Sequence, residues 1–134
     1  MSFWASFLYR QFFRYPPKPT ASFKGKTIVV TGANVGLGKE AVRWFVQLGA
    51  SQVILACRNL EKGQAAAKEI QLSTGCSPRT LAVWHLDMSS YDSVKAFSAR
   101  VKKELPHLDA LVGNAGISTT TFRMTEVSPN DFPS

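Results

Sequence analysis

The sequence has few residues of the kind that bind metals or form disulfides, with two cysteines and two histidines among 134 residues. Cys57 and Cys76 form no CxxC pair, and neither histidine stands three or four positions from a cysteine. We therefore expect no metal site, and reduced thiols inside a cell rather than the disulfide framework of a secreted protein. Both cysteines are expected to be small apolar core residues.

Long hydrophobic runs are also missing. No stretch reaches the roughly 18 apolar residues that cross a bilayer, and the N-terminus has no basic segment followed by an apolar core. The sequence thus predicts neither a transmembrane helix nor a secretory signal. We expect an intracellular protein, either cytoplasmic or peripheral on an intracellular membrane, and not a secreted one.

Acidic residues are absent from the first 39 positions. The formal net charge of +7 is concentrated there, because residues 1–39 carry six Lys or Arg and no acid, whereas residues 40–134 carry ten bases and nine acids. A nearly neutral body offers no continuous face for a phosphate backbone. Nucleic acid is therefore not an expected partner.

Aromatic residues crowd the same segment, where residues 1–15 hold seven of the fifteen aromatics in the chain. Trp4, Leu8 and Phe12 repeat at the spacing of a helix with an apolar stripe, and Pro16 and Pro17 end it. Two interpretations are open. The favoured one is that this arm packs back on its own domain. The other is that residues 1–15 make weak contact with a membrane surface, with the arginines facing anionic lipid.

From Lys24 onward, short runs of β-branched and apolar residues alternate with helical patterns. The expected strands are 26–31, 52–56, 81–86 and 110–113, and the expected helices are 36–48, 60–72 and 91–105. This alternation predicts an α/β fold with a parallel sheet that is covered by helices on both faces. It corresponds to half of a doubly wound sheet.

A glycine-rich segment, Thr31-Gly-Ala-Asn-Val-Gly-Leu-Gly38, joins the first strand to the helix that follows it. Glycines allow a sharp turn there and let the backbone approach a pyrophosphate at the helix N-terminus. The segment is not a P-loop, because alanine stands at the first required glycine and glutamate follows the lysine. Its spacing also differs from GxGxxG.

The TGxxxGxG spacing, with Asp87 at the end of the third strand and Asn114-Ala-Gly116 after the fourth, resembles the short-chain dehydrogenase/reductase family. Within that family, Gly25–Gly38 and Ala56–Gly63 look most like the retinol-dehydrogenase-like and fungal relatives. The resemblance covers about residues 24–118. It implies a Rossmann-type sheet, truncated here after about four strands in the order 3-2-1-4.

The resemblance also implies roles for single residues. The pyrophosphate and the adenosine ribose would be lined by Gly32, Asn34, Gly36, Leu37 and Gly38. Asp87 would meet the adenine, with Met88 beside it. The residues that would stabilise the central sheet and border the nicotinamide ribose are Asn114, Ala115 and Gly116. The chain departs from the family pattern at Gly113, where a second asparagine is usual.

The end of the second strand bears on cofactor preference. NAD-preferring sites place an acid there to bind the ribose 2′-OH, and that acid repels a 2′-phosphate. Here the positions are Ala56, Cys57 and Arg58, and the guanidinium of Arg58 is able to pair with the phosphate. We therefore expect NADP(H) to be preferred over NAD(H), the alternative being that Arg58 is a solvated loop residue.

Catalysis in the family rests on a serine and a Tyr-x-x-x-Lys pair on a helix beyond the fifth strand, where the lysine lowers the tyrosine pKa for proton exchange with the substrate. The one such spacing in this sequence is Tyr91 to Lys95. It precedes Asn114 instead of following it, so we interpret it as a chance match and assign no catalytic residue. Asn114 is expected to be structural and close to the cofactor.

These patterns divide the chain into an aromatic and basic N-terminal arm (1–23), a partial NAD(P)-binding Rossmann domain (24–118) and an irregular C-terminal tail (119–134). We expect the front portion of a longer reductase. One hypothesis is the cofactor-binding half of an NADP(H)-dependent oxidoreductase, whose small alcohol or carbonyl substrate binds only in a full-length form. The alternative is a non-catalytic dinucleotide-binding or interaction fragment.

Overall fold

The computed structural model describes residues 2–116, so the predicted tail over 119–134 lies outside the described residues. Four parallel strands form one sheet in the order β3-β2-β1-β4. The strands are β1 (Thr27–Thr31), β2 (Gln52–Cys57), β3 (Leu81–His85) and β4 (Ala110–Val112). The α/β class and the strand order 3-2-1-4 are therefore confirmed.

Three helices connect the strands: α2 (Gly36–Gln47), α3 (Leu60–Thr74) and α4 (Tyr91–Glu104). The side chain of Asn59 caps the start of α3 by accepting from the N–H of Lys62, and Gly75 ends it in the left-handed conformation. Ser90 caps α4 in the same way. These local signals explain why the observed elements begin and end within two residues of the predicted ones.

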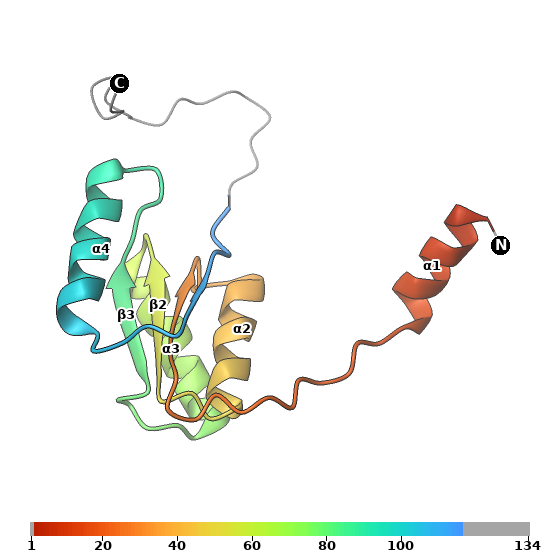
Figure 1. Ribbon diagram of the computed structural model, residues 1–134, viewed down its shortest axis with the longest axis horizontal. Helices are drawn as coiled ribbons and strands as arrows, with labels where there is room; N and C mark the ends of the chain where they lie inside the picture. Colours follow the sequence, from red (N-terminus) through yellow and green to blue (C-terminus); the bar gives the residue numbers. More distant parts are fainter. Residues whose placement is uncertain (1, 117–134) are drawn as a thin grey trace.

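The sheet has a helix layer on each face, with α4 standing alone on one side (Figure 1). Because side chains alternate along a strand, Ile28 and Val30 point toward α2 and α3, where they join one apolar cluster with Val42 and Ile70. Val29 belongs to a second cluster on the other face, under α4. The strands are thus buried from both sides, as parallel strands require.

The helix α1 (Phe3–Phe13) stands apart from this body (Figure 1). Within the described residues it contacts no other helix or strand, and none of its residues is buried. The favoured expectation, that the arm packs back on its domain, is therefore wrong. Two features explain the separation. The segment that follows α1 contains three prolines, which hold the backbone extended. Phe23 already covers the core beside α2 through an edge contact with Phe45.

Candidate functional site

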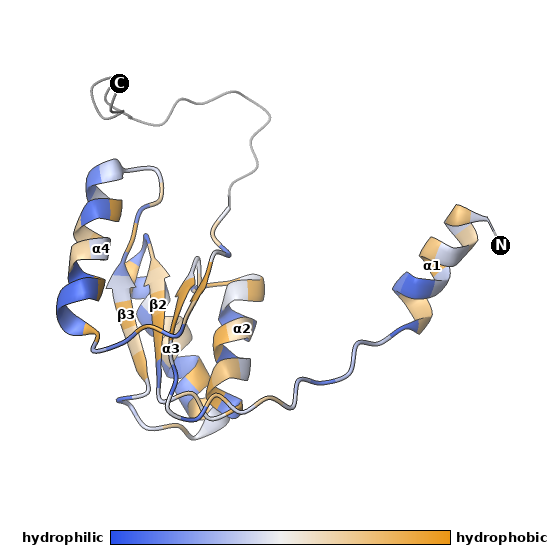
Figure 2. Cartoon of the chain, in the orientation of Figure 1, coloured by the Kyte–Doolittle hydropathy of each residue, from blue (hydrophilic) through white to orange (hydrophobic). Residues whose placement is uncertain are grey.

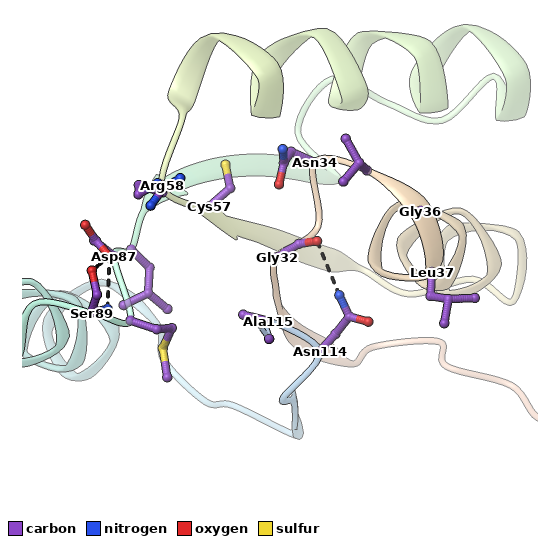
Figure 3. Close-up of a pocket in the computed structure, with 14 residues that line it drawn as sticks. Gly32, Asn34, Gly36, Leu37, Cys57, Arg58, Asp87, Ser89, Asn114 and Ala115 are labelled. Carbon is purple, nitrogen blue, oxygen red and sulfur yellow. Dashed lines mark hydrogen bonds between the residues drawn. The ribbon is translucent and has the colours of Figure 1, made fainter. Parts of the chain in front are cut away.

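The loops that follow all four strands meet at the carboxyl edge of the sheet, where they line a cavity of about 670 Å³ (Figure 3). Crevices at this edge are the usual ligand sites of open α/β sheets. Every predicted cofactor-binding residue except Gly38 lines the cavity, namely Gly32, Asn34, Gly36, Leu37, Arg58, Asp87, Met88, Asn114, Ala115 and Gly116. Residues that are 84 positions apart in the sequence, Gly32 and Gly116, therefore contribute to one site.

The turn after β1 depends on two glycines with positive φ, Gly32 (63°) and Gly36 (56°). A Cβ at Gly32 would lie 3.0 Å from the Cα of Ala115, so the two segments approach as closely as their backbones allow. A Cβ at Gly36 would meet no atom within 4 Å, because this residue borders the open cavity. The turn thus presents bare backbone to a ligand, which suits a pyrophosphate.

Gly38 has a different position from the one expected. It lies inside the first turn of α2, where a Cβ would come within 2.5 Å of Nδ2 of Asn114 and 2.6 Å of the carbonyl oxygen of Gly32. Gly38 is buried and does not line the cavity. Its role is to let α2 pack closely against the loop that ends β4.

The N-terminus of α2 is open toward the cavity. Val35 occupies the N-cap position and makes no side-chain capping bond, and the first turn contains no acidic residue. The first amides of a helix lack acceptors of their own, and the helix dipole adds partial positive charge there. These amides are placed to bind an anion, and Gly36 and Leu37 bring them to the cavity wall.

A compact hydrogen-bond network joins the ends of β1 and β4. The side-chain amide of Asn114 donates to the carbonyl oxygens of Thr31 (3.1 Å) and Gly32 (3.3 Å), the second of which is drawn in Figure 3. The hydroxyl oxygen of Thr31 accepts from the N–H groups of Asn114 and Ala115, each at 3.0 Å. This network holds the Asn114 segment against the glycine-rich turn. Thr31 was not among the predicted site residues, although its place in the TGxxxGxG segment was a signal for it.

Asp87 is held as an acceptor on the far wall of the cavity. Its Oδ1 accepts from the hydroxyl of Ser89 at 2.6 Å and from the N–H of Ser89 at 2.9 Å. The two bonds from Ser89 lower the pKa of Asp87 below its usual value, and the charges of Arg58 and His85 add to the effect. At neutral pH this carboxylate is ionised and suited to accept a hydrogen bond from an amino group.

Arg58 directly follows β2 and extends beside the cavity, exposed to solvent (Figure 3). None of the ion pairs formed within residues 2–116 involves its guanidinium. Cys57 precedes it and is buried, and burial raises the pKa of its thiol. The expected core position of Cys57 is confirmed, but the residue also lines the cavity. Cys76 is half-buried.

Four further residues line the cavity and were not predicted from the sequence: Val35, Cys57, Leu86 and Ser89. Each is adjacent to a predicted residue or lies two positions from one, so proximity in sequence was the available signal. Tyr91 and Lys95 do not line the cavity. The ammonium of Lys95 lies 4.6 Å from the centroid of the Tyr91 ring and 3.5 Å from a carboxylate oxygen of Asp92, so this pair is engaged at the surface of α4.

A comparison with protein families matches residues 26–134 to the short-chain dehydrogenases. The chain belongs to the short-chain dehydrogenase/reductase family. The match includes residues 117–134, beyond the described part of the chain. Among curated members, the chain is 53% identical over 120 residues to the short chain dehydrogenase/reductase dmxR8 of Cryptosporiopsis sp., covering 90% of this chain and 37% of that protein.

Solved structures of the family agree with the fold. A short-chain dehydrogenase from Shigella flexneri complexed with NADP has a TM-score of 0.63 and 32% identity, over 74% of this chain and 41% of that one. Menthone neomenthol reductase from Mentha piperita has a TM-score of 0.64 and 33% identity, over 69% and 32%. The chain thus spans well under half the length of these family members.

Proposed function

We propose that this chain supplies the dinucleotide-binding part of an NADP(H)-dependent oxidoreductase that interconverts an alcohol and a carbonyl compound. The observation that carries the proposal is the cavity at the carboxyl edge, which combines an open helix N-terminus with Arg58, an arginine that takes part in none of the ion pairs within residues 2–116. Family membership supports a nicotinamide dinucleotide in general. The preference for NADP(H) rests on the residues that follow β2.

The phosphates are assigned to the glycine-rich turn. The backbone at Gly36 and the first amides of α2 would bind the pyrophosphate, because they combine free donors with the positive end of the helix dipole. The adenine is assigned to the opposite wall, where the ionised carboxylate of Asp87 would accept from its amino group beside Met88. The separation of these two walls across one cavity suits an elongated ligand.

The 2′-phosphate is assigned to Arg58. The last two residues of β2 are Ala56 and Cys57, so no carboxylate stands where it would repel that phosphate. The Arg58 guanidinium makes no ion pair within the described residues that a phosphate would have to displace. A charge-assisted pair of this kind favours NADP(H) by about tenfold to a hundredfold.

The chemistry of the proposed enzyme comes from the nicotinamide, which donates or accepts a hydride at C4. The role of this chain is to position the nicotinamide. Asn114 and Ala115, which Thr31 holds in place, form the wall where the nicotinamide ribose is expected. Two of the solved structures support this assignment by analogy: one is a menthone neomenthol reductase, and the other is a short-chain dehydrogenase complexed with NADP.

A second candidate is a dinucleotide-binding module without catalysis. Its support is the position of the one Tyr-x-x-x-Lys pair, which lies on α4 and outside the cavity. Residues 2–116 therefore provide a place for the cofactor but no Tyr-x-x-x-Lys pair beside it. In this hypothesis the chain binds NADP(H) and does not turn over a substrate.

Titration of the whole chain with NADPH and NADH, followed by nucleotide fluorescence, tests the proposal. We expect saturable binding with a dissociation constant at least tenfold lower for NADPH, and displacement by 2′,5′-ADP but not by 5′-AMP at equal concentration. Equal affinity for the two nucleotides would overturn the NADP(H) preference. An assay with alcohols and carbonyl compounds separates the two candidates, since turnover by this chain alone would contradict the binding module.

A further inference from the structure

The arm that precedes the body leaves an unusual amount of apolar surface exposed. Six aromatic rings of residues 3–13 project from α1, and none of them is buried. Trp4 is 69% exposed, Phe12 67% and Phe13 70%. The ring pairs that they form within the described residues are with one another, as in the stacked pair of Tyr9 and Phe13 with centroids 5.4 Å apart. Among residues 2–116, no other helix or strand contacts α1. An exposed apolar surface of this kind marks a site that binds a partner or a membrane.

The apolar side chains cover most of the circumference of α1. Successive residues turn by about 100° around a helix, which places Leu8 and Phe12 opposite Arg10. Ser6 and Arg10 form one narrow polar strip, and Gln11 is a single polar position within the remaining apolar arc. Figure 2 shows the helix in orange and pale sections, with one blue section. A groove on a protein surface covers one stripe of a helix, whereas lipid surrounds a wide arc. The distribution therefore favours lipid over a protein groove.

The charges beside the helix have one sign. Residues 1–39 contain no acid, and Arg10, Arg14, Lys18 and Lys24 take part in none of the ion pairs within residues 2–116. Free basic side chains next to an apolar helix complement the negative charge of phosphatidylserine and related headgroups. Tryptophan and tyrosine rings are also enriched at the level of the headgroups.

We propose that residues 2–18, which we call the arm anchor, lie in the headgroup region of an anionic membrane. The helix does not span the bilayer: its 11 residues extend about 16 Å, roughly half the hydrocarbon thickness. Local residues set both ends of the helix: the hydroxyl of Ser2 accepts from the N–H of Ala5 at the start, and prolines follow at 16 and 17. None of the helices in the described part of the chain has the length and hydrophobicity of a membrane span. The arm anchor therefore lies in the plane of the surface.

The attachment point keeps the nucleotide cavity away from that surface. The arm joins the body just before β1, at the amino edge of the sheet, where the N–H of Phe23 donates to the carbonyl oxygen of Leu48 (Figure 1). The cavity lies at the opposite, carboxyl edge, beyond the end of β1 at Thr31. Membrane attachment through the arm anchor is thus compatible with an open cavity.

Vesicle flotation with the full chain tests the proposal. Vesicles of phosphatidylcholine alone are compared with vesicles that also contain phosphatidylserine, and the bound fraction is measured. We expect binding to the anionic vesicles and a loss of roughly tenfold or more in the partition coefficient when Trp4, Leu8 and Phe12 are all changed to serine. The variant Arg10→Gln/Arg14→Gln is expected to lose about thirtyfold in the partition coefficient on anionic vesicles and little on neutral ones. Because α1 contacts no other helix or strand within residues 2–116, we expect these variants to keep the folded body, which circular dichroism checks.

Two matched controls use the body of the chain. Leu72→Ser removes an apolar side chain of α3 that is 78% exposed, and Lys102→Gln/Lys103→Gln removes two positive charges from α4. Both are expected to float like the unchanged chain. Quenching of tryptophan fluorescence by brominated lipid gives a second measurement. We expect Trp4 to account for the fluorescence that is quenched, so Trp4→Phe should abolish the quenching.

Several outcomes would overturn the proposal. One is that the full chain binds neither kind of vesicle. Another is that the body controls lose as much binding as the arm variants, and a third is that the bound fraction does not depend on vesicle charge. The alternative is that α1 binds a second copy of the chain, and sedimentation equilibrium tests this. A dimer that is lost in the triple serine variant, in a chain that does not float with vesicles, would assign α1 to self-association instead.

Discussion

The hydroxyl oxygen of Thr31, at the end of β1, accepts a hydrogen bond of 3.0 Å from the backbone N–H of Asn114, which is 83 residues away and follows β4. The same oxygen accepts from the N–H of Ala115, and the hydroxyl donates to the carbonyl oxygen of Val112. One buried side chain thus fixes the loop after β4 against the glycine-rich turn. The wall assigned to the nicotinamide ribose depends on this contact.

The change Thr31→Val should lower the free energy of unfolding by about 1–3 kcal/mol while keeping the side-chain shape. It removes the acceptor of the Ala115 N–H and leaves the Asn114 N–H with the carbonyl oxygen of Val112 alone. Urea unfolding with an unchanged m-value measures the loss. Thr27→Val is the matched control, since the hydroxyl of Thr27 takes part in none of the side-chain hydrogen bonds within residues 2–116. Equal losses in the two variants would contradict the role given to Thr31.

The change Gly38→Ala should also destabilise the chain, by about 1–3 kcal/mol, since the new Cβ would overlap the Asn114 amide and the Gly32 carbonyl. We expect NADPH affinity to fall with it, because the displaced groups belong to the cavity wall. The control is Gly113→Ala, where the added Cβ meets nothing within 4 Å and φ is not positive. A Gly38→Ala variant as stable as this control would show that α2 moves freely relative to the loop.

The change Arg58→Asp should reverse the nucleotide preference. We expect NADPH affinity to fall about tenfold to a hundredfold through loss of the charge pair and repulsion of the 2′-phosphate, while NADH affinity is kept or rises. Fluorescence titration of both nucleotides measures this. Arg79→Asp makes the same charge change on the turn before β3, outside the cavity, and should leave the preference unchanged. Unchanged NADPH affinity in Arg58→Asp would remove the basis of the proposed preference.

Asp109 should make the stability of the chain fall at acid pH. Its Oδ2 accepts from the N–H of Thr27 at 2.8 Å and its Oδ1 from the ammonium of Lys26 at 3.0 Å. These bonds lower the pKa of Asp109 in the folded chain. Its contribution is therefore complete above the unfolded pKa of about 3.9, and it is lost as pH falls through the lower folded value.

Urea midpoints of the unchanged chain and of Asp109→Asn, measured from about pH 2 to pH 7, test this dependence. The difference between the two should be constant at neutral pH and shrink below about pH 4. Asp92→Asn removes a carboxylate that is 93% exposed and serves as the control. A difference that grows as pH falls would have the wrong sign and would exclude the proposed cause.

The positions of the strands and helices were predictable because each depends on nearby residues. The β-branched run at 27–31, the cap at Asn59 and the left-handed Gly75 act over a few positions, so their effect can be read from sequence. Alternation of strands with helices also limits the topology, since crossovers in parallel sheets are right-handed. Most of the cavity was predictable for the same reason, because strand ends meet at one edge.

The remaining features depend on contacts between distant residues. Gly38 was expected beside the ligand, but its approach to Asn114 makes it a packing residue, and no local pattern encodes that distance. The sequence predicted a helix within residues 1–15, but only the structure shows that this helix contacts no other helix or strand among residues 2–116. The sequence by itself determined the elements, their order and the loops that carry the site, because these follow from local chemistry and chain connectivity. Only the tertiary structure decided which residues face the cavity and that the arm stands free, because packing joins segments more than 80 residues apart.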